Sequence, residues 1–336
     1  MNVLSLFDGI SCGRVALDRL GIPVDSYYAS EVCPKAIKIA QRNYIGTMQL
    51  GDVSQLTDDY LRSLDIDLLI GGSPCQGFSI AGKRQGCVTS DNIDILTLEH
   101  YLSLKEQGYT FNGQSYLFWE YIRVMRAIKP AHYLLENVKV LKKWIPIFNH
   151  NMGVLPYAFN SKTVSAQSRP RLYWTNIRGL REPKDKGIKM LDILESSTSS
   201  IYHYDRATFS YKHRLRGDKY RWNHHRHGVN YDIKELTHDD CFQVADLPGL
   251  YLTQLRRVLS ASGKSGTLLG GLGGNLEQKI YDHDMDVARK LTPLECERLQ
   301  TLPDNYTKGP TDPTRYSVLG NGWTVDIIAH ILKEIT

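Results

Sequence analysis

The sequence predicts an α/β protein built on a doubly wound, mostly parallel sheet, with a second, smaller domain. Apolar, strand-like runs alternate with amphipathic, helix-like runs through the first half of the chain. Strand ends recur about every twenty residues, which is the spacing of βαβ units. The 336 residues are 42% hydrophobic and 23% charged, so the chain can bury one large core and a smaller one.

The first four strands are predicted from apolar runs that turn residues bound on both sides. They cover residues 2–7, 24–30, 47–51 and 67–70. A helix-like run follows the first strand and closes at Gly21, and Pro34 stands at the first position of the helix after the second strand. The ends of these strands should therefore meet at one edge of a parallel sheet.

Three further segments of regular structure are expected before residue 180. Residues 116–130 form a helix that Pro130 ends, and residues 132–137 form another buried strand. Residues 163–177 carry β-branched and aromatic residues around a polar middle, which is typical of two strands joined by a turn.

The composition of the chain changes after about residue 180. Residues 194–200 are polar and of low complexity, which favours a loop. Regular structure returns at 292–303, where Thr292 is an N-cap, a proline follows it and Glu295 completes a capping box. The last predicted helix covers residues 324–335.

Charge, cysteine usage and the first residues of the chain limit the class of protein. No stretch approaches the ~20 apolar residues of a membrane span, and Met1 leads directly into a strand, which leaves no room for a signal peptide. The six cysteines are scattered, without the close pairs of a zinc site or a disulfide framework. We expect a reducing, cytoplasmic setting and no metal. The net charge of +5 is too small to identify a nucleic-acid partner by itself.

Acidic residues stand at the ends of three successive predicted strands. The loop "FDGISCG" at 7–13 allows a tight turn but carries Asp8 where a pyrophosphate would disfavour an acid. Glu31 ends the second strand, at the usual place of an acid that binds ribose hydroxyls, and Asp52 follows the third. Together they predict a pocket for S-adenosylmethionine. The alternative is that each acid caps the helix that follows it.

A cysteine in "GGSPCQGFS" follows the fourth strand at the same edge. Cys75 is either a small residue in a turn or a nucleophile that a substrate can reach. Glu136 ends an apolar strand, an unfavourable place for a carboxylate without a partner or a task. Arg169 and Arg171 are two residues apart, so both would face one side of an extended strand. The acid could protonate a heterocyclic ring while the thiolate attacks it, and an arginine could bind the carbonyl oxygen of the same ring.

These motifs, in their order along nearly the whole chain, resemble those of the cytosine-5 DNA methyltransferase family. The short length of the chain is similar to that of the bacterial and phage enzymes, although the residues of several motifs are similar to those of the animal de novo branch. The matching motifs are "FDGISCG", "SEVCP", "GDV", "GGSPCQGFS", "LLENV", "QSRPR", "RKLTPLECERLQTLPDNY" and "GNGWTV".

The resemblance implies a mechanism and a set of residues. A cytosine would be flipped out of duplex DNA, Cys75 would add to ring carbon 6, and Glu136 would hold and protonate N3. Arg171 would contact the base carbonyl, and Arg169 would support Cys75. The residues implied for binding S-adenosylmethionine are Phe7, Asp8, Gly9, Cys12, Gly13, Glu31, Val32, Asp52, Val53, Pro74, Asn321, Gly322 and Trp323.

The resemblance also implies domain roles. Residues 1–179 plus 301–336 would form the catalytic and cofactor-binding domain, and 180–300 the target-recognition domain. Residues 201–230 carry seven Lys or Arg against two Asp or Glu, with six aromatic residues, which favours DNA contact over a merely solvated basic face. Residues 83–112 would be a long mobile loop that closes over the flipped base. The glycines of 263–274 either let backbone approach phosphates or form a hinge.

Several alternatives stay open at this level. His224, His225 and His227 lack an acid or cysteine at ligand spacing, so metal is not expected. A cytosine-5 tRNA methyltransferase would use the same catalytic set, and an inactive DNA-binding relative would be expected to have lost it. A restriction endonuclease partner, the recognition sequence and the oligomeric state do not follow from the sequence.

Overall fold

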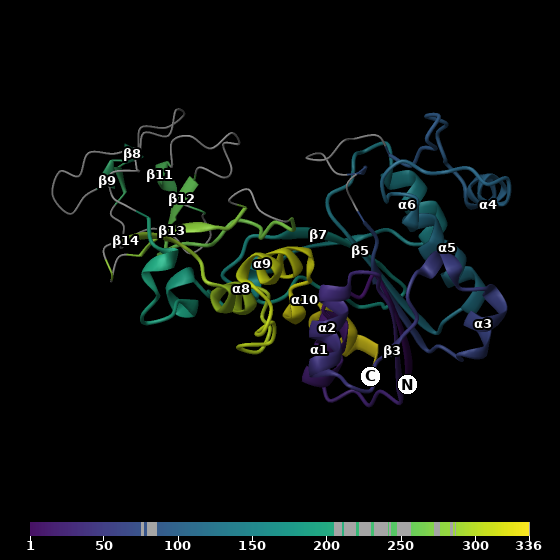
Figure 1. The fold of residues 1–336 in the computed structure, drawn as a ribbon, viewed down its shortest axis with the longest axis horizontal. Helices are drawn as coiled ribbons and strands as arrows, with labels where there is room; N and C mark the ends of the chain where they lie inside the picture. The colour runs from purple at the N-terminus through teal and green to yellow at the C-terminus, as the bar shows by residue number, and fades with distance from the viewer. Residues whose placement is uncertain are drawn as a thin grey trace. The chain divides into compact units, whose positions relative to one another are not determined.

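The computed structural model contains a seven-stranded sheet in the order β3-β2-β1-β4-β5-β7-β6 (Figure 1). Its strands are β1 Asn2–Leu6, β2 Ser26–Ser30, β3 Met48–Gln49, β4 Leu68–Gly72, β5 His132–Asn137, β6 Tyr157–Asn160 and β7 Pro170–Thr175. The structure describes residues 1–74, 77–78, 86–204, 210–211, 220–221, 230–231, 241, 243–246, 257–271, 276–282, 285 and 287–335. The predicted α/β class with a mostly parallel sheet is confirmed.

The parallel strands are aligned so that their carboxyl ends are level. Leu6 of β1 pairs with Ser30 of β2 and with Gly71 of β4, and Gly71 pairs in turn with Leu135 of β5. The order of the strands reverses between β1 and β4, and open α/β sheets bind ligands at such a reversal, outside the carboxyl ends of the strands. Strand β7 runs antiparallel to β5.

Helices cover both faces of this sheet. Figure 1 shows α1 and α2 on one side and α3 to α6 on the other. Apolar residues of the second group close the main core together with the buried side of β4 and β5, and Phe118, Trp119 and Phe148 are almost fully buried there. These helices are α1 Cys12–Arg19, α2 Pro34–Asn43, α3 Asp58–Ser63, α4 Leu98–Glu106, α5 Leu117–Ile128 and α6 Ile145–Met152.

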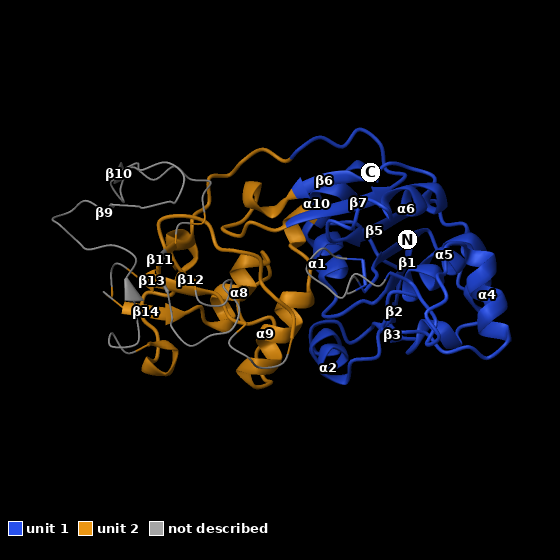
Figure 2. Ribbon diagram, turned by 90° about the horizontal axis from the view of Figure 1, so that it is seen from above, with its two compact units in different colours: residues 1–159, 170–182, 328–336 blue, residues 160–169, 183–327 orange. Residues whose placement is uncertain are grey.

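The chain divides into two compact units (Figure 2). The first comprises residues 1–159, 170–182 and 328–336, and the second comprises residues 160–169 and 183–327. The second unit holds a five-stranded sheet, a two-stranded sheet and the later helices. These elements are β8 Ser210–Tyr211, β9 Tyr220–Arg221, β10 Asn230–Tyr231, β11 Gln243–Asp246, β12 Arg257–Ser260, β13 Lys279–Asp282, β14 Val287–Lys290, α8 Pro293–Leu299, α9 Asp312–Asn321 and α10 Val325–Leu332, the last of which continues into the first unit.

The predicted capping box at the start of α8 is confirmed. The Thr292 hydroxyl accepts from the backbone N–H of Glu295, and the Glu295 carboxylate accepts from the N–H of Thr292. The same carboxylate forms a bidentate pair with Arg289, with both N–O distances 2.8 Å. Arg289 also donates to Asp282 at 3.0 Å, and all three side chains are buried. Helix α8 is therefore tied to β13 and β14 by a buried ionic group.

Two predicted segments differ from the structure. Residues 163–177 contain one strand, β7, and not the two that were predicted. The polar first half of the segment forms hydrogen bonds to residues 264–268 and does not form a second strand. The long mobile loop predicted over 83–112 is wrong for residues 86–112. Cys87, Ile95 and Tyr101 are buried in the main core, and helix α4 begins at Leu98, so apolar burial fixes this segment.

In the part of the chain that the structure describes, no helix is both long enough and apolar enough to cross a membrane.

Replacing Arg289 should destabilise the second unit. Arg289→Met leaves Asp282 and Glu295 buried without their cation, and removing one partner of a buried ion pair costs about 3–5 kcal/mol. Urea unfolding, combined with hydrogen exchange of the β13 and α8 amides, measures this loss. Arg257→Met removes the same charge from an exposed position of β12 and should change stability by less than about 0.5 kcal/mol. Equal losses of stability in the two variants would contradict the role of Arg289 in the buried ionic group.

Candidate active site

The loop after β1 has an unusual backbone. Phe7, Gly9 and Ser11 all have positive φ, of 56°, 59° and 60°, and two of these residues are not glycine. Such conformations persist where the surroundings enforce them, and they cluster at binding sites. Here the N–H groups of Phe7 and Asp8 both donate to the carbonyl of Ser30, which fixes the loop to the end of β2.

The Asp8 carboxylate holds this loop from inside. One oxygen accepts from the Ser11 hydroxyl at 2.5 Å and the other from the Tyr27 hydroxyl at 2.8 Å. Burial raises the pKa of Asp8 above its ordinary value, although the hydrogen bonds from Ser11, Ser5 and Tyr27 act in the opposite direction. The ionised form of Asp8 is thus unfavourable. The residue lies at the point where the strand order reverses.

Glu31 joins the first loop to the second. Its Oε2 accepts from the N–H of Gly9, and its Oε1 accepts from the N–H groups of Val32 and Cys33, all at 2.8 Å. The carboxylate therefore caps the approach to α2, as the alternative interpretation of the sequence expects. A carboxylate offers about four acceptor positions, so one stays available for a ligand. Val32 beside it is 62% exposed and presents an apolar surface to solvent.

Asp52 lies just past the end of β3. Its Oδ1 accepts from the N–H of Ser54 at 2.9 Å, which caps the 3-10 turn Val53–Gln55. The side chain is otherwise exposed. Ser30 donates to the carbonyl of Gly51 at 2.7 Å, so the ends of β2 and β3 are joined directly. Capping and ligand binding are compatible at this position as well.

The other residues predicted to bind the cofactor differ in how exposed they are, and they belong to different compact units. Cys12, Gly13 and Val53 are buried, and Pro74 is half-buried. Asn321, Gly322 and Trp323 belong to the second unit, where Asn321 is exposed at the end of α9.

Cys75 lies outside the described residues, but the chain on either side of it is firmly held. Asn137 donates to the carbonyl and the hydroxyl of Ser73, at 3.2 and 3.1 Å. Gly77 donates to the Ser115 hydroxyl at 3.0 Å, and Phe78 packs edge-on against aromatic rings of the core. A side chain at residue 77 would place Cβ 2.3 Å from the Ser115 hydroxyl, so this close approach requires glycine.

Glu136 and Arg171 form an ion pair on neighbouring strands. The distance from Nε of Arg171 to Oε1 of Glu136 is 2.9 Å, and Glu136 is 8% exposed. Glu136 also lies level with Gly72, the last residue of β4, because β4 and β5 are paired in parallel. The structure thus brings together the predicted acid, one predicted arginine and the strand that leads to Cys75.

Arg169 does not share a strand face with Arg171, contrary to the sequence prediction. Strand β7 begins at Pro170, and Arg169 belongs to the second unit. Arg169 is 4% exposed, and its guanidinium donates to the carbonyls of Leu268, Gly320 and Gly322 at 2.9–3.0 Å. Arg169 therefore holds the glycine-rich segment and the end of α9 within this unit.

The structure adds residues that sequence reasoning did not single out. Asn137 and Ser115 position the flanks of Cys75, as described above. Gln167 is fully buried and bonds Leu268, Leu299 and Gln300, so it links three segments of the second unit. The only sequence signal for Asn137 and Gln167 is that each lies in a matched motif, because their partners are distant in the chain.

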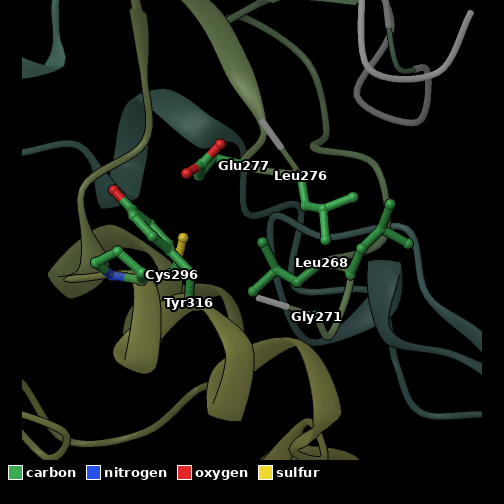
Figure 3. A pocket seen from close by; sticks show the side chains of 8 residues that line it. Leu268, Gly271, Leu276, Glu277, Cys296 and Tyr316 are labelled. Carbon is green, nitrogen blue, oxygen red and sulfur yellow. The ribbon is translucent and has the colours of Figure 1, made fainter. Parts of the chain in front are cut away.

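Several sequence predictions concern residues outside the described part of the chain. They include His224, His225 and His227, and most of the basic segment 201–230. Among the described residues, no group of His, Cys, Asp and Glu could hold a metal ion. The second unit also contains a small, mostly apolar cavity, lined by Leu268, Leu276, Tyr316 and others (Figure 3). It contains none of the residues predicted to act in catalysis or cofactor binding.

A parallel sheet with acids and two anchored loops at the reversal of its strand order is the arrangement of α/β enzymes that bind nucleosides and nucleotides. The family model described as C-5 cytosine-specific DNA methylase matches residues 1–336. The chain therefore belongs to this family, and it is a methyltransferase. The resemblance found in the sequence is confirmed.

Relatives and solved structures agree with this assignment. The type II methyltransferase M.HpaII of Haemophilus parainfluenzae is 26% identical over 353 residues, which cover 99% of this chain and 88% of the relative. M.HhaI of Haemophilus parahaemolyticus is 24% identical and covers 100% and 94% of the two chains. The fold is similar to that of S. pombe Dnmt2 methyltransferase, with a TM-score of 0.66, 17% identity and coverage of 99% and 97%.

Asp8 should make stability depend on pH in a definite direction. Its pKa is raised in the folded chain, so between the ordinary and the raised pKa the folded state holds a proton that the unfolded state has lost. The free energy of unfolding contributed by Asp8 therefore falls as the pH rises through this window. Asp8→Asn should gain thermal stability relative to wild type as the pH rises above 3.8, the ordinary pKa of an aspartate. A difference that stays constant across this range would contradict the burial of an ionisable Asp8.

A side chain at residue 77 should disturb the anchoring of the cysteine loop. Gly77→Ala forces Cβ against the Ser115 hydroxyl and the carbonyl of Gly86, and such overpacking costs about 1–3 kcal/mol. Urea unfolding measures the loss. Gly46→Ala is the matched control, because a Cβ there meets nothing within 4 Å. If both variants unfold at the same urea concentration as wild type, the close approach at Gly77 does not exist.

Proposed function

We propose that the chain transfers a methyl group from S-adenosylmethionine to carbon 5 of cytosine in duplex DNA. The observation that carries this proposal is the buried Glu136 carboxylate, paired with Arg171 and level with the end of the strand that leads to Cys75. A proton donor, a cation and a thiol meet the requirements of nucleophilic attack on a pyrimidine ring. Family membership and the DNA-methyltransferase relatives support the same reaction.

The residues at the ends of β1, β2 and β3 fit S-adenosylmethionine. Glu31 and Asp52 offer acceptors for hydroxyl and amino groups, and the exposed Val32 offers an apolar surface to a base. No pyrophosphate has to be accommodated beside Asp8. When bound, the cofactor supplies a methyl group on a positively charged sulfur. The proposed role of the chain is to hold this nucleoside at the reversal of the strand order.

In the proposed mechanism, the first step belongs to Cys75 and Glu136. A cytosine is flipped out of the duplex, which costs a few kcal/mol of unstacking and pairing. The Cys75 thiolate forms a bond to carbon 6, and electron density moves toward N3, where Glu136 donates a proton. Arg171 keeps Glu136 in place and contributes a positive charge next to the base carbonyl.

The later steps restore the enzyme. Carbon 5, now electron-rich, would accept the methyl group as the methyl–sulfur bond of the bound cofactor breaks, which leaves a neutral thioether. A base then removes the proton from carbon 5, and the bond between carbon 6 and Cys75 breaks, with its electron pair leaving on the thiolate. N3 returns its proton to Glu136, which restores the acid for the next cycle. Arg169 supports this cycle indirectly, since it fixes the backbone of Leu268, Gly320 and Gly322. Its proposed role is to order the part of the chain that carries Asn321 to Trp323.

Residues 180–300 are proposed to recognise the DNA target, and the rest of the chain to carry out catalysis. The basic, aromatic composition of 201–230 supports phosphate and base contacts. The named relatives include type II methyltransferases and an orphan methyltransferase of Bacillus phage SPbeta, which is 25% identical over 434 residues. A restriction–modification role in the cytoplasm of a bacterial or phage-infected cell, with or without a cognate endonuclease, is consistent with such relatives.

Methyl transfer from radiolabelled S-adenosylmethionine tests the proposal. Wild type should label duplex DNA, whereas Cys75→Ala should lower the rate at least about 10³-fold and Glu136→Gln at least about 10²-fold, because a nucleophile and a proton donor are lost. A duplex that carries 5-fluorocytosine should form a covalent, denaturation-resistant adduct with wild type only, since fluorine on carbon 5 cannot leave as a proton does.

The two variants should lose methyl transfer and retain binding of the cofactor. Both should still bind S-adenosylmethionine with wild-type affinity, as measured by calorimetry, because neither residue is placed at the cofactor acids. Normal methylation by Cys75→Ala would overturn the mechanism. Labelling of tRNA and not of duplex DNA by wild type would overturn the proposed substrate and favour the RNA-methylating branch.

A further inference from the structure

A cluster of charged side chains, centred on a buried carboxylate, lies behind the turn that follows Asp52. We call it the Glu120 cluster, and it consists of Tyr101, Lys105, Glu120, Arg123 and Asp58. The side chains come from α3, α4 and α5, all in the first unit. None of these residues belongs to the motifs assigned above, and none has a role in the proposed chemistry.

Glu120 is the centre of the cluster and is fully buried. Its Oε1 accepts from the Tyr101 hydroxyl at 2.6 Å and from Nζ of Lys105 at 2.7 Å. Its Oε2 accepts from Nε of Arg123 at 2.8 Å and lies 2.7 Å from Nη2. Four donors therefore surround one carboxylate, which fixes the position of both cations.

Both cations reach from Glu120 to the main chain of the Asp52 turn. Nζ of Lys105 donates to the carbonyl of Ser54 at 3.0 Å, and Nη2 of Arg123 donates to the carbonyl of Val53 at 3.0 Å. Arg123 also pairs with Asp58, in the first turn of α3. The turn begins at Asp52, whose carboxylate accepts from Ser54 N–H. Arg123 thus holds the Val53–Ser54 peptide group, whose N–H orients the Asp52 carboxylate, and Lys105 holds the next peptide group of the same turn.

Stability alone gives little reason for such an arrangement. A buried ion pair usually stabilises a fold no better than apolar side chains of the same volume, because desolvation offsets the attraction. A carbonyl that accepts from a fixed cation, in contrast, keeps a defined position with little freedom. Val53 is already buried, so packing holds one side of the turn, while Asp52 itself is exposed and has no such constraint.

We propose that Lys105 and Arg123, fixed by Glu120, are positioning residues for cofactor binding, which act by orienting Asp52 toward the amino group of the adenine base. This inference rests on the proposed function, since it takes S-adenosylmethionine as the ligand. The cluster acts on affinity for the cofactor and not on the chemical step, because it lies behind the end of β3, whereas Glu136 lies on β5, with β2, β1 and β4 between these two strands.

Lys105 offers the mildest test, since it is 34% exposed and is one of two cations on Glu120. Lys105→Met should raise the Kd and KM for S-adenosylmethionine about fivefold, with kcat within twofold of wild type and the KM for DNA unchanged. Lys105→Arg keeps a donor and should restore most of the affinity. Lys38→Met removes the same charge from an exposed position of α2 and should leave the Kd for the cofactor unchanged.

A double-mutant cycle separates positioning from a general effect on folding. In an Asp52→Ala background, Lys105→Met should change the Kd for S-adenosylmethionine by less than twofold, because the group that it orients is absent. Calorimetric titration of the four proteins measures this coupling. A fivefold loss in both backgrounds, or unchanged affinity in Lys105→Met, would overturn the inference. If wild type itself fails to bind S-adenosylmethionine, the proposed function fails and not this coupling alone.

Discussion

The level ends of β2, β1, β4 and β5 are the constraint on which the rest of the site depends. Because Leu6 pairs with both Ser30 and Gly71, and Gly71 with Leu135, the residues that follow them emerge at the same edge of the sheet. Adjacent strands lie about 4.8 Å apart, so Glu31 and Glu136 end strands separated by about 14 Å. The acids proposed to bind the cofactor and the residues proposed to react can therefore face one another across a distance suited to the proposed nucleoside and cytosine base. A shift of one residue in any of these pairings would reverse the direction of the side chains.

Buried charges in this protein are held in place by fixed partners and serve geometry more than stability. Glu136 has Arg171, Glu120 has Lys105 and Arg123, and Glu295 has Arg289. In each case at least one of the cations comes from a different element than the carboxylate, so the pair links two strands, two helices or a strand and a helix. Asp8 is the exception, because hydroxyl donors replace a cation and burial raises its pKa. Asp8 lies at the reversal of the strand order, where a role in ligand binding would explain an acid whose ionised form is unfavourable.

Local signals in the sequence were sufficient for the parts of the structure that depend on neighbouring residues. Apolar runs placed the strands of the parallel sheet, and Thr292 with Glu295 marked the start of α8. Long-range pairing decided what could not be read locally. Gln167 bonds residues 101 and more positions away, which prevents a strand before Pro170 and directs Arg169 into the second unit. The mobile loop over 83–112 was expected from the family resemblance and not from a local signal, and the burial of Cys87, Ile95 and Tyr101 in the core could not be read from the sequence.

Methylation inside the cell tests the central claim most directly, because it requires the cofactor, the target and the chemistry together. Plasmid DNA from cells that express the chain is treated with bisulfite, which leaves 5-methylcytosine unconverted, and is then sequenced. The structure and the family predict unconverted cytosines at one short recurrent sequence with wild type, and complete conversion with Cys75→Ala. Complete conversion with wild type, or the same protected sites with Cys75→Ala, would contradict the claim.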